Sequence, residues 1–294
     1  MLPRAWYQLH TVSPLLRWPA KWLLLACGVL LVLFPKPWLL FVLLERARDM
    51  EQLLDPDHPG LAVFEADVLE RTAADAPVAE LLATVEQVVR ERVPYAWDWE
   101  TWGVMEYLPT VDEVLARGQE DCDGRAVVAA SLLRRMGHEA WLVSDIVHMW
   151  VQTRDGETMS PGGVVTLVAA EPGASGTQTA VTLDLLANLV RGTAFGVSVF
   201  PLTREVALLL LVCALTWHPR VGLWRFACGA LLMWIGLDWL RRVGQTAAVA
   251  GGAGPISAAL AATALIACGW LVMAMKRRSV AGAVDYSGRS AARF

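Results

Sequence analysis

The sequence predicts an α+β domain inserted between an N-terminal transmembrane helix and a C-terminal helical membrane region. Three observations lead to this fold class. Hydrophobic residues make up 55% of the 294 residues, which is high for a water-soluble domain. These residues concentrate in residues 19–44 and 195–275. Between the two stretches, amphipathic helix patterns are followed by strand patterns, and this order is typical of an α+β domain.

Charge divides the chain in the same way. Residues 45–191 contain 26 acidic residues, 11 arginines and no lysine, whereas the remainder is basic. An acidic domain argues against nucleic acid as a partner, because the phosphate backbone binds basic surfaces. Four of the five cysteines lie in the apolar stretches, and no cysteine spacing is typical of a disulfide framework or a metal site. We therefore expect neither a metal nor another cofactor.

The first apolar segment is predicted to be an uncleaved membrane anchor. Residues 18–34 form an apolar run next to basic residues, and no small-residue cleavage site follows. The anchor is expected to end near Pro35, and an interfacial helix is expected to begin around Trp38. Residues 1–18 are accordingly predicted to be a cytoplasmic N-terminus, and residues 19–44 to hold the anchor and the interfacial helix.

Residues 195–275 are expected to contain about three transmembrane helices. The first candidate, REVALLLLVCALTW, is short and should borrow apolar residues from FGVSVFPLT before it. VGLWRFACGALLMWIGLDWL and GPISAALAATALIACGWLVMAM follow. Lysines and arginines of the short loops and termini gather on one side, which predicts cytoplasmic termini. The domain over residues 45–194 should then be extracytoplasmic. If the chain lies in a bacterial inner membrane, this domain is in the periplasm. Residues 276–294 should form a flexible cytoplasmic tail.

Apolar spacing and capping residues predict the helices of the domain. Residues 77–93 have apolar side chains at helical spacing with charges between them. Thr110 and Glu113 form a capping box that begins a short helix, and Gly118 closes it. A third helix is expected over about residues 123–136.

Strand patterns follow these helices. EAWLVSD and HMWVQT are predicted to be two strands, and RDGE gives a hairpin turn after the second. VVTLVAA and TAVTLDLL, which flank a glycine-rich loop, are predicted to be further strands.

Cys122 is the candidate for a reactive side chain in the domain. Free N–H groups and the helix dipole favour a thiolate at a helix start, and a histidine such as His148 on a neighbouring strand could accept the thiol proton. An inert, packed cysteine is the alternative. Glu120, Asp121 and Asp123 flank the thiol, and their negative charge should raise its pKa, although Asp121 is also expected to cap the helix.

The segment PTVDEVLARGQEDCDGRAVVAASLLRRMGHEAWLV, followed by HMWVQTRDGETMSP, resembles the transglutaminase-like superfamily, including its bacterial cysteine-peptidase-like branch. The resemblance covers roughly residues 94–161 and implies a papain-like fold. It implies that Cys122 is the nucleophile and His148 the base. Where the family has an Asp-Pro pair that orients the histidine, this chain has Ser160, which could accept a hydrogen bond but carries no charge. Asp145 and Asp184 are other acids whose positions relative to the histidine the sequence leaves open.

The activity implied by this resemblance is cysteine-dependent acyl transfer or amide hydrolysis on protein or peptide substrates at the outer face of the membrane. The main-chain N–H of Cys122 would stabilise the oxyanion, with an indole N–H from Trp97, Trp99 or Trp102 as a second donor. The alternative is a catalytically inactive domain that serves as a structural or docking subunit of a membrane protein complex. Expected partners are membrane lipid, together with other membrane proteins or a protein or peptide substrate.

Overall fold

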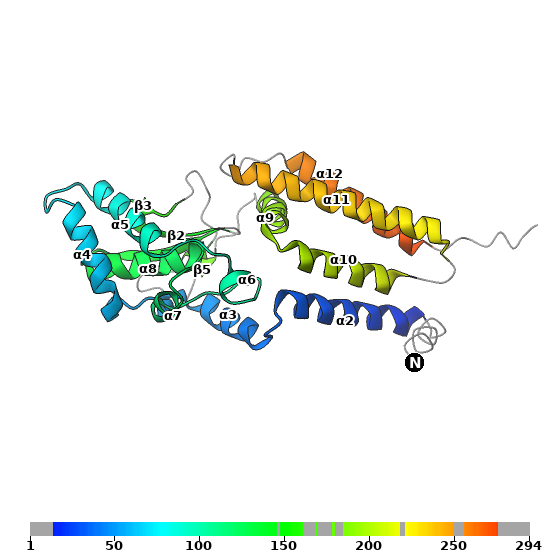
Figure 1. The fold of residues 1–294 in the computed structure, drawn as a ribbon, viewed down its shortest axis with the longest axis horizontal. Coiled ribbons are helices and arrows are strands. Elements are labelled where there is room, and N and C mark those ends of the chain that lie inside the picture. The colour runs from blue at the N-terminus through cyan, green and yellow to red at the C-terminus, as the bar shows by residue number, and fades with distance from the viewer. Residues whose placement is uncertain are drawn as a thin grey trace, which may run out of the picture.

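Helices dominate the fold, and one small antiparallel sheet accompanies them (Figure 1). The computed structural model describes residues 14–145, 148–160, 168–169, 178–179, 185–217, 221–249 and 256–275. These residues form two parts, which we call the helix bundle and the α+β unit. The bundle contains α2 (Pro14–Leu33), α9 (Leu185–Val199), α10 (Leu202–Thr216), α11 (Leu223–Val249) and α12 (Ile256–Ala274).

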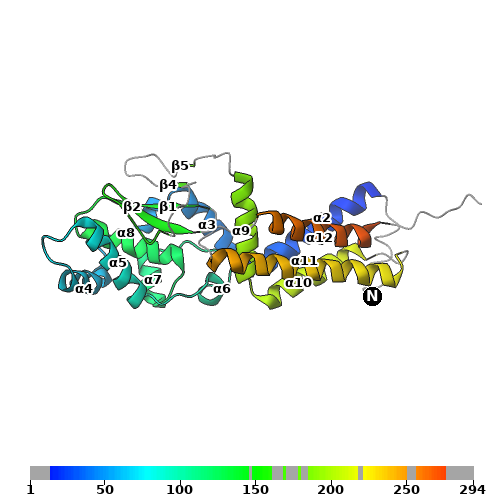
Figure 2. The same cartoon turned by 90° about the horizontal axis from the view of Figure 1, so that it is seen from above.

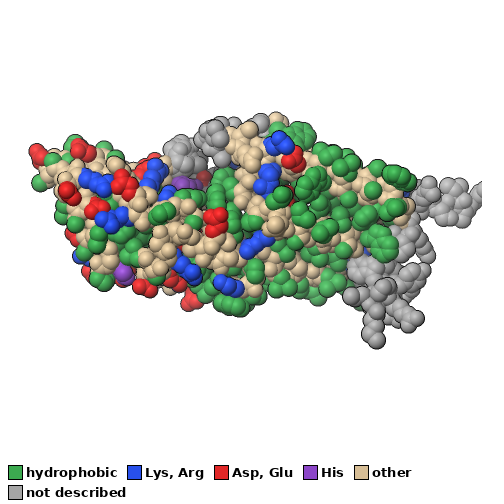
Figure 3. Space-filling view, viewed as in Figure 1, with side chains coloured by type: hydrophobic (Ala, Val, Ile, Leu, Met, Phe, Trp, Pro, Cys, Tyr) green, Lys and Arg blue, Asp and Glu red, His purple; other side chains and the backbone are tan. Residues whose placement is uncertain are grey.

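Three helices of the bundle, α2, α11 and α12, are long and apolar enough to cross a membrane. The number rises to four if α9 and α10 together count as one broken span. Large hydrophobic side chains remain exposed along the bundle, as at Leu15 (85%), Leu210 (63%) and Trp224 (84%). On the face drawn in Figure 3, hydrophobic side chains cover the bundle, and charged side chains gather on the α+β unit. This distribution indicates a membrane protein with one polar part.

A sharp bend separates α9 from α10. We expected FGVSVFPLT to extend the following apolar segment into one span, but the chain bends by 112° between the two helices. Pro201 lies at the bend and lacks the N–H that a continuing helix would need. As a result α9 lies across the end of the bundle, between the other helices and the α+β unit (Figure 2).

Arg241 of α11 fixes this bend. Its guanidinium donates hydrogen bonds to the carbonyl oxygens of Ser198 (3.1 Å) and Phe200 (2.8 Å) and pairs with the buried Glu205 carboxylate. The cation therefore satisfies carbonyl groups that the end of α9 leaves without helical partners.

Glycines allow α11 to approach its neighbours closely. A Cβ added to Gly244 would lie 2.0 Å from the carbonyl oxygen of Ala194 in α9. A Cβ added to Gly229 would lie 2.6 Å from the carbonyl oxygen of Gly269 in α12. Small residues at such contacts are typical of helices that pack in a membrane.

A helix, α3 (Trp38–Arg48), occupies the segment predicted to be interfacial, and it runs four residues beyond the expected end at residue 44. It follows α2 after a turn with two prolines. One of its faces stays exposed and apolar, with Trp38 at 61%, Phe41 at 71% and Leu44 at 50% exposure.

The α+β unit places helices against one face of a five-stranded sheet. Two short 3₁₀ helices and five α-helices precede the sheet: η1 (Met50–Leu53), η2 (Pro59–Leu61), α4 (Ala62–Arg71), α5 (Val78–Arg92), α6 (Asp98–Thr101), α7 (Val111–Arg117) and α8 (Cys122–Arg135). The strands are β1 (Ala140–Ser144), β2 (Met149–Thr153), β3 (Glu157–Thr158), β4 (Val168–Ala169) and β5 (Gln178–Thr179). Their order is β3-β2-β1-β4-β5, and all neighbours are antiparallel. The core includes Val88 of α5, Leu132 of α8 and Trp150 of β2, all of them fully buried.

Most predicted elements of the unit are present. Thr110 and Glu113 form the capping box of α7, and Gly118 ends this helix with φ +69°. Asp121 caps α8, which begins one residue earlier than expected. The strand predicted for TAVTLDLL is wrong at its end, because α9 begins at Leu185. Parts of this stretch and of VVTLVAA lie outside the described residues.

Hydrogen bonds join the α+β unit to the bundle at the loop before α7. Lys36 Nζ donates to the carbonyl oxygen of Trp102 (3.2 Å), and Arg204 Nη2 donates to that of Gly103 (2.8 Å). The N–H of Met105 donates to the carbonyl oxygen of Leu33 at the end of α2 (2.9 Å). The loop thus lies directly at the end of a candidate membrane span.

Candidate functional site

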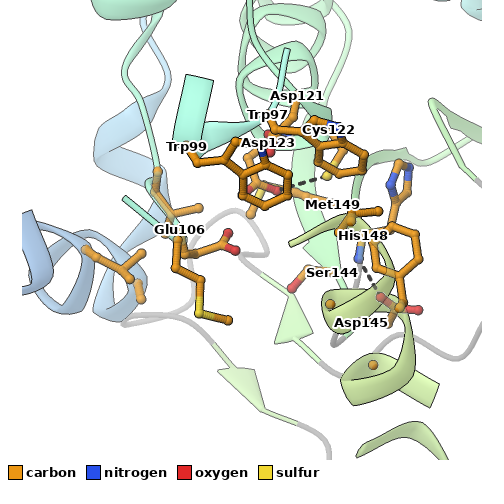
Figure 4. Close-up of a pocket in the computed structure, with 18 of the residues that line it drawn as sticks. Trp97, Trp99, Glu106, Asp121, Cys122, Asp123, Ser144, Asp145, His148 and Met149 are labelled. Carbon is orange, nitrogen blue, oxygen red and sulfur yellow. Dashed lines mark hydrogen bonds between the residues drawn. The ribbon is translucent and has the colours of Figure 1, made fainter. Parts of the chain in front are cut away.

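Cys122 and His148 line the same pocket, which has a volume of about 630 Å³ (Figure 4). Four parts of the chain form its walls: α3, the loop around α6, the start of α8 with the β1–β2 connection, and α9. The polar lining residues lie mainly around the thiol, whereas α3 and α9 contribute mostly apolar side chains. The pocket therefore lies at the junction between the α+β unit and the bundle.

The start of α8 positions the Cys122 thiol. Asp121 Oδ1 accepts a hydrogen bond from the N–H of Asp123 (3.1 Å), which caps the helix. The thiol donates to Asp123 Oδ1 (3.5 Å) and lies against the main-chain N–H of Met149. Because Met149 follows His148 at the start of β2, this contact brings the predicted nucleophile and the start of the predicted base's strand together.

Burial raises the pKa of the Cys122 thiol well above its usual range, and the carboxylates of Asp123 and Asp121 raise it further. The Met149 N–H favours the thiolate, but its effect is smaller. The acids thus act as the sequence predicted. The thiol is neutral at pH 7 and would need a base at the moment of attack.

Two contacts orient His148. Its Nε2–H donates to the carbonyl oxygen of Met159 (2.9 Å), and its main-chain N–H donates to Asp145 Oδ1 (2.7 Å). A carbonyl only accepts, so Nε2 carries a proton, and no hydrogen bond to the described residues occupies Nδ1, the ring atom that could accept one. Among the described residues, no hydrogen bond joins this imidazole to the Cys122 thiol.

A main-chain carbonyl orients the imidazole. His148 Nε2 bonds to the carbonyl oxygen of Met159, the residue before Ser160, whose side chain the sequence suggested as a possible acceptor. Met159 has φ +63°, a conformation that costs a residue with a side chain about 1–3 kcal/mol. Glu86 of α5 holds it there, because Glu86 Oε2 accepts the Met159 N–H (2.9 Å). A neutral carbonyl stabilises an imidazolium less than a carboxylate would.

Buried carboxyl groups surround the start of α8. Oxygens of Asp98, Glu120 and Asp121 lie within 4.8 Å of one another, and all three residues are buried. Trp102 Nε1–H donates to Glu120 Oε1, and the Tyr107 N–H donates to Asp98 Oδ2. Within the described part of the chain, Asp98 Oδ1 has no hydrogen-bond partner. Carboxylate oxygens in this arrangement could hold a hard divalent cation such as Ca²⁺ or Mg²⁺.

The crowding of these carboxyl groups favours their neutral forms. Burial, followed by the charge of Asp121, raises the pKa of Asp98 to about 11. Burial also raises the pKa of Glu120, Asp121 and Asp123. Glu106, at the pocket wall, shares a hydrogen bond with Asp123, and burial raises its pKa as well. Asp123, whose carboxyl group contacts the thiol, therefore holds its own proton more strongly than an ordinary carboxyl group does.

The three tryptophans proposed as oxyanion donors have different positions. Trp97 and Trp99 line the pocket and stack on each other with ring centroids 5.1 Å apart. Trp102 is buried, and its indole N–H is bonded to Glu120, so it cannot serve as a donor in the pocket.

Sequence reasoning missed Asp98, Glu106, Glu86 and Met159. The first two stand 24 and 16 residues before the cysteine in an aromatic loop whose path the sequence does not indicate. Glu86 lies on the helix 77–93 and has no distinguishing sequence pattern. Of the acids left open, Asp145 contacts the His148 main chain, and Asp184 lies outside the described residues.

Comparison of the chain with family models, with curated proteins and with solved structures gives no match. The resemblance to the transglutaminase-like superfamily therefore stays a prediction from the sequence.

Proposed function

We propose that the chain is a membrane-anchored enzyme of transglutaminase-like chemistry, in which Cys122 carries out acyl transfer or amide hydrolysis. The observation that carries the proposal is the shared pocket: a cysteine at a helix start and a histidine line one cavity of about 630 Å³. Nucleophilic catalysis requires a nucleophile, a base and space for a substrate at the same place.

In the proposed reaction, the Cys122 sulfur attacks a carbonyl carbon, and an S–C bond forms. The thiol proton passes to His148 Nδ1, which lines the same pocket. The C–N or C–O bond of the substrate then breaks, and the leaving nitrogen or oxygen takes this proton. Water or a second amine resolves the thioester and restores the thiol.

The protonation state of Cys122 determines how the nucleophile is activated. Burial raises the pKa of the thiol, so the sulfur is protonated before the reaction and a base must remove the proton during the attack. We expect activity to rise with pH above neutrality for this reason.

Hydrolysis of p-nitrophenyl acetate by the full chain in detergent tests the proposal. We expect turnover above buffer that is abolished in Cys122→Ala and reduced at least tenfold in His148→Ala. Cys228→Ala, at an exposed cysteine of α11, is the matched control and should retain full activity. Release of p-nitrophenol that is equal in the chain and in Cys122→Ala would refute catalysis at this thiol.

The second candidate function is a catalytically inactive domain that serves as a structural or docking subunit. The raised pKa of Cys122 and the absence of a hydrogen bond to His148 among the described residues favour this reading. Under this alternative, the same assay gives no turnover that depends on Cys122.

A further inference from the structure

We propose that the pocket receives a membrane-borne acyl donor, with its reactive carbonyl at Cys122 and a long aliphatic chain along α3 and α9. This inference rests on the proposed function and names its substrate class. A lipid ester and an N-acyl amide of a lipid-modified protein share this chemistry.

The first argument is the position of the pocket. Leu43 and Ala47 of α3 and Phe195 and Val199 of α9 contribute to its walls. The outer face of α3 exposes Trp38, Phe41 and Leu44, and Figure 2 shows α9 across the end of the apolar bundle. Apolar helices that border the candidate spans lie at the level of the membrane interface. A substrate that diffuses in the bilayer therefore meets the pocket at its apolar side.

The second argument is the distribution of polar groups. Around the thiol the pocket offers Asp121, Asp123, Ser144, Asp145 and His148. The wall formed by α9 offers side chains without hydrogen-bonding groups, and its main-chain groups are used within the helix. A peptide backbone along this wall would leave its N–H and C=O groups unpaired, which is costly, whereas an alkyl chain has none.

The third argument is Gly196, which lines the pocket from the interior of α9. A Cβ added there would meet no heavy atom within 4 Å, so helix packing does not require glycine at this position. Glycine in a helix interior is unfavourable relative to alanine. Its presence keeps open the space that the aliphatic chain would occupy.

Chain-length dependence tests this inference. We compare kcat/KM for p-nitrophenyl acetate and p-nitrophenyl octanoate, using the full chain in detergent. We expect the octanoate to be preferred at least tenfold. In Gly196→Leu the preference should fall to about one, because the added side chain fills the space for the aliphatic chain. Leu189→Phe adds bulk at an exposed site of the same helix, outside the pocket lining, and should keep the preference.

The arms of the experiment separate the possible sources. Cleavage of octanoyl p-nitroanilide in addition to the ester would indicate an N-acyl amide, and cleavage of the ester alone would indicate a lipid ester. Equal kcat/KM for acetate and octanoate would overturn the inference while leaving the proposed function intact. A preference for the p-nitroanilide of a polar tripeptide over the octanoyl one would overturn it in favour of a peptide substrate.

Photolabelling decides the question if no turnover depends on Cys122, in which case the proposed function fails. A fatty amide that carries a diazirine in its alkyl tail would be crosslinked to the unmodified protein and, separately, to the Gly196→Leu variant. Weaker labelling of residues 195–200 in the variant, with unchanged labelling of α12, would uphold the aliphatic site. Equal labelling of residues 195–200 in both proteins would overturn it.

Discussion

At the scale of single residues, the charge around Cys122 controls its reactivity. Asp123 accepts the thiol hydrogen bond and is, after burial, the largest cause of the raised thiol pKa. We therefore expect Asp123→Asn to lower the pKa of Cys122 and to speed its alkylation by iodoacetamide at pH 8.5, by about tenfold for each pKa unit. In the unmodified chain, alkylation should keep rising above pH 9.

This measurement needs a chain in which the other four cysteines are replaced by alanine, since several of them are exposed. Asp155→Asn, at an exposed acid in the hairpin turn, is the matched control and should leave the rate unchanged. An Asp123→Asn rate equal to that of the control would show that the carboxylate does not govern the thiol.

Glu86 is predicted to be a positioning residue for His148. It holds the N–H of Met159, whose carbonyl oxygen accepts the imidazole hydrogen bond. Glu86→Ala should lower kcat/KM for p-nitrophenyl acetate by about tenfold or more, because the base loses its orientation. Glu86→Gln keeps an acceptor for this N–H and should retain most of the activity.

The pH profile separates positioning from stability, because a misplaced base shifts the rising limb of kcat/KM whereas partial unfolding lowers the whole curve. Glu80→Ala, at an exposed acid of the same helix, is the control. Equal losses in Glu86→Ala and Glu86→Gln would refute the positioning role.

At the scale of elements, the bend between α9 and α10 decides where the apolar wall of the pocket lies. Arg241→Met removes the cation that caps the end of α9 and leaves the buried Glu205 carboxylate unpaired. We expect the free energy of unfolding to fall by about 3–5 kcal/mol, the usual effect of breaking a buried ion pair. Adding Glu205→Gln should recover part of the loss, as a double-mutant cycle in detergent would measure.

Arg242→Met is the matched control for this prediction. The neighbouring arginine pairs with Asp238 at the surface, and its side chain is 71% exposed. Exposed pairs contribute about 0–1 kcal/mol, so this change should be nearly silent. If the two arginine variants are equally stable, Arg241 does not fix the bend.

Short-range sequence patterns predicted most elements of the α+β unit. They did not predict contacts between residues that are far apart in the sequence. The capping box at Thr110 and the Asp121 cap depend on residues within one turn, so the sequence carries them. The bend at Pro201 depends partly on Arg241, which is 40 positions away in the sequence. The apolar pattern of the segment does not indicate this contact. The Met159 carbonyl that accepts the imidazole hydrogen bond belongs to a residue with positive φ, and no sequence pattern indicates this conformation.

At the scale of the whole molecule, the buried acids make stability depend on pH. Asp98, Asp121 and Asp123 have folded-state pKa values above their unfolded values. Above about pH 4 the folded chain therefore binds more protons than the unfolded chain does. The free energy of unfolding should therefore be largest at acidic pH and should fall toward pH 8. Thermal unfolding of the full chain in detergent at pH 5 and pH 8 measures this.

Asp98→Asn should flatten this dependence. The amide oxygen can still accept the Tyr107 N–H, and no charge remains to be buried. We expect stability at pH 8 to rise by about 1 kcal/mol or more, because the folded chain no longer has to keep a proton on this group. Asp75→Asn, at an exposed acid, should leave the pH dependence unchanged. A chain that is more stable at pH 8 than at pH 5 would contradict the assignment of raised pKa values.

The architecture of the whole molecule follows from composition to a large extent. Apolar stretches predicted a membrane protein, and three candidate spans confirm this coarse prediction. The start of α2 and the end of α12 lie at the same end of the bundle, away from the α+β unit (Figure 1). The compartment of that unit stays a prediction from the charge of the loops.

The most direct test of the central claim is detection of the acyl intermediate on Cys122. The full chain is mixed with p-nitrophenyl acetate, quenched in acid within seconds and digested, and the peptide that contains Cys122 is weighed by mass spectrometry. We predict an acetyl group on this cysteine as a thioester that hydroxylamine removes, with less of it in His148→Ala. An unmodified Cys122 peptide under conditions in which p-nitrophenol is released would contradict a role for this thiol as the nucleophile.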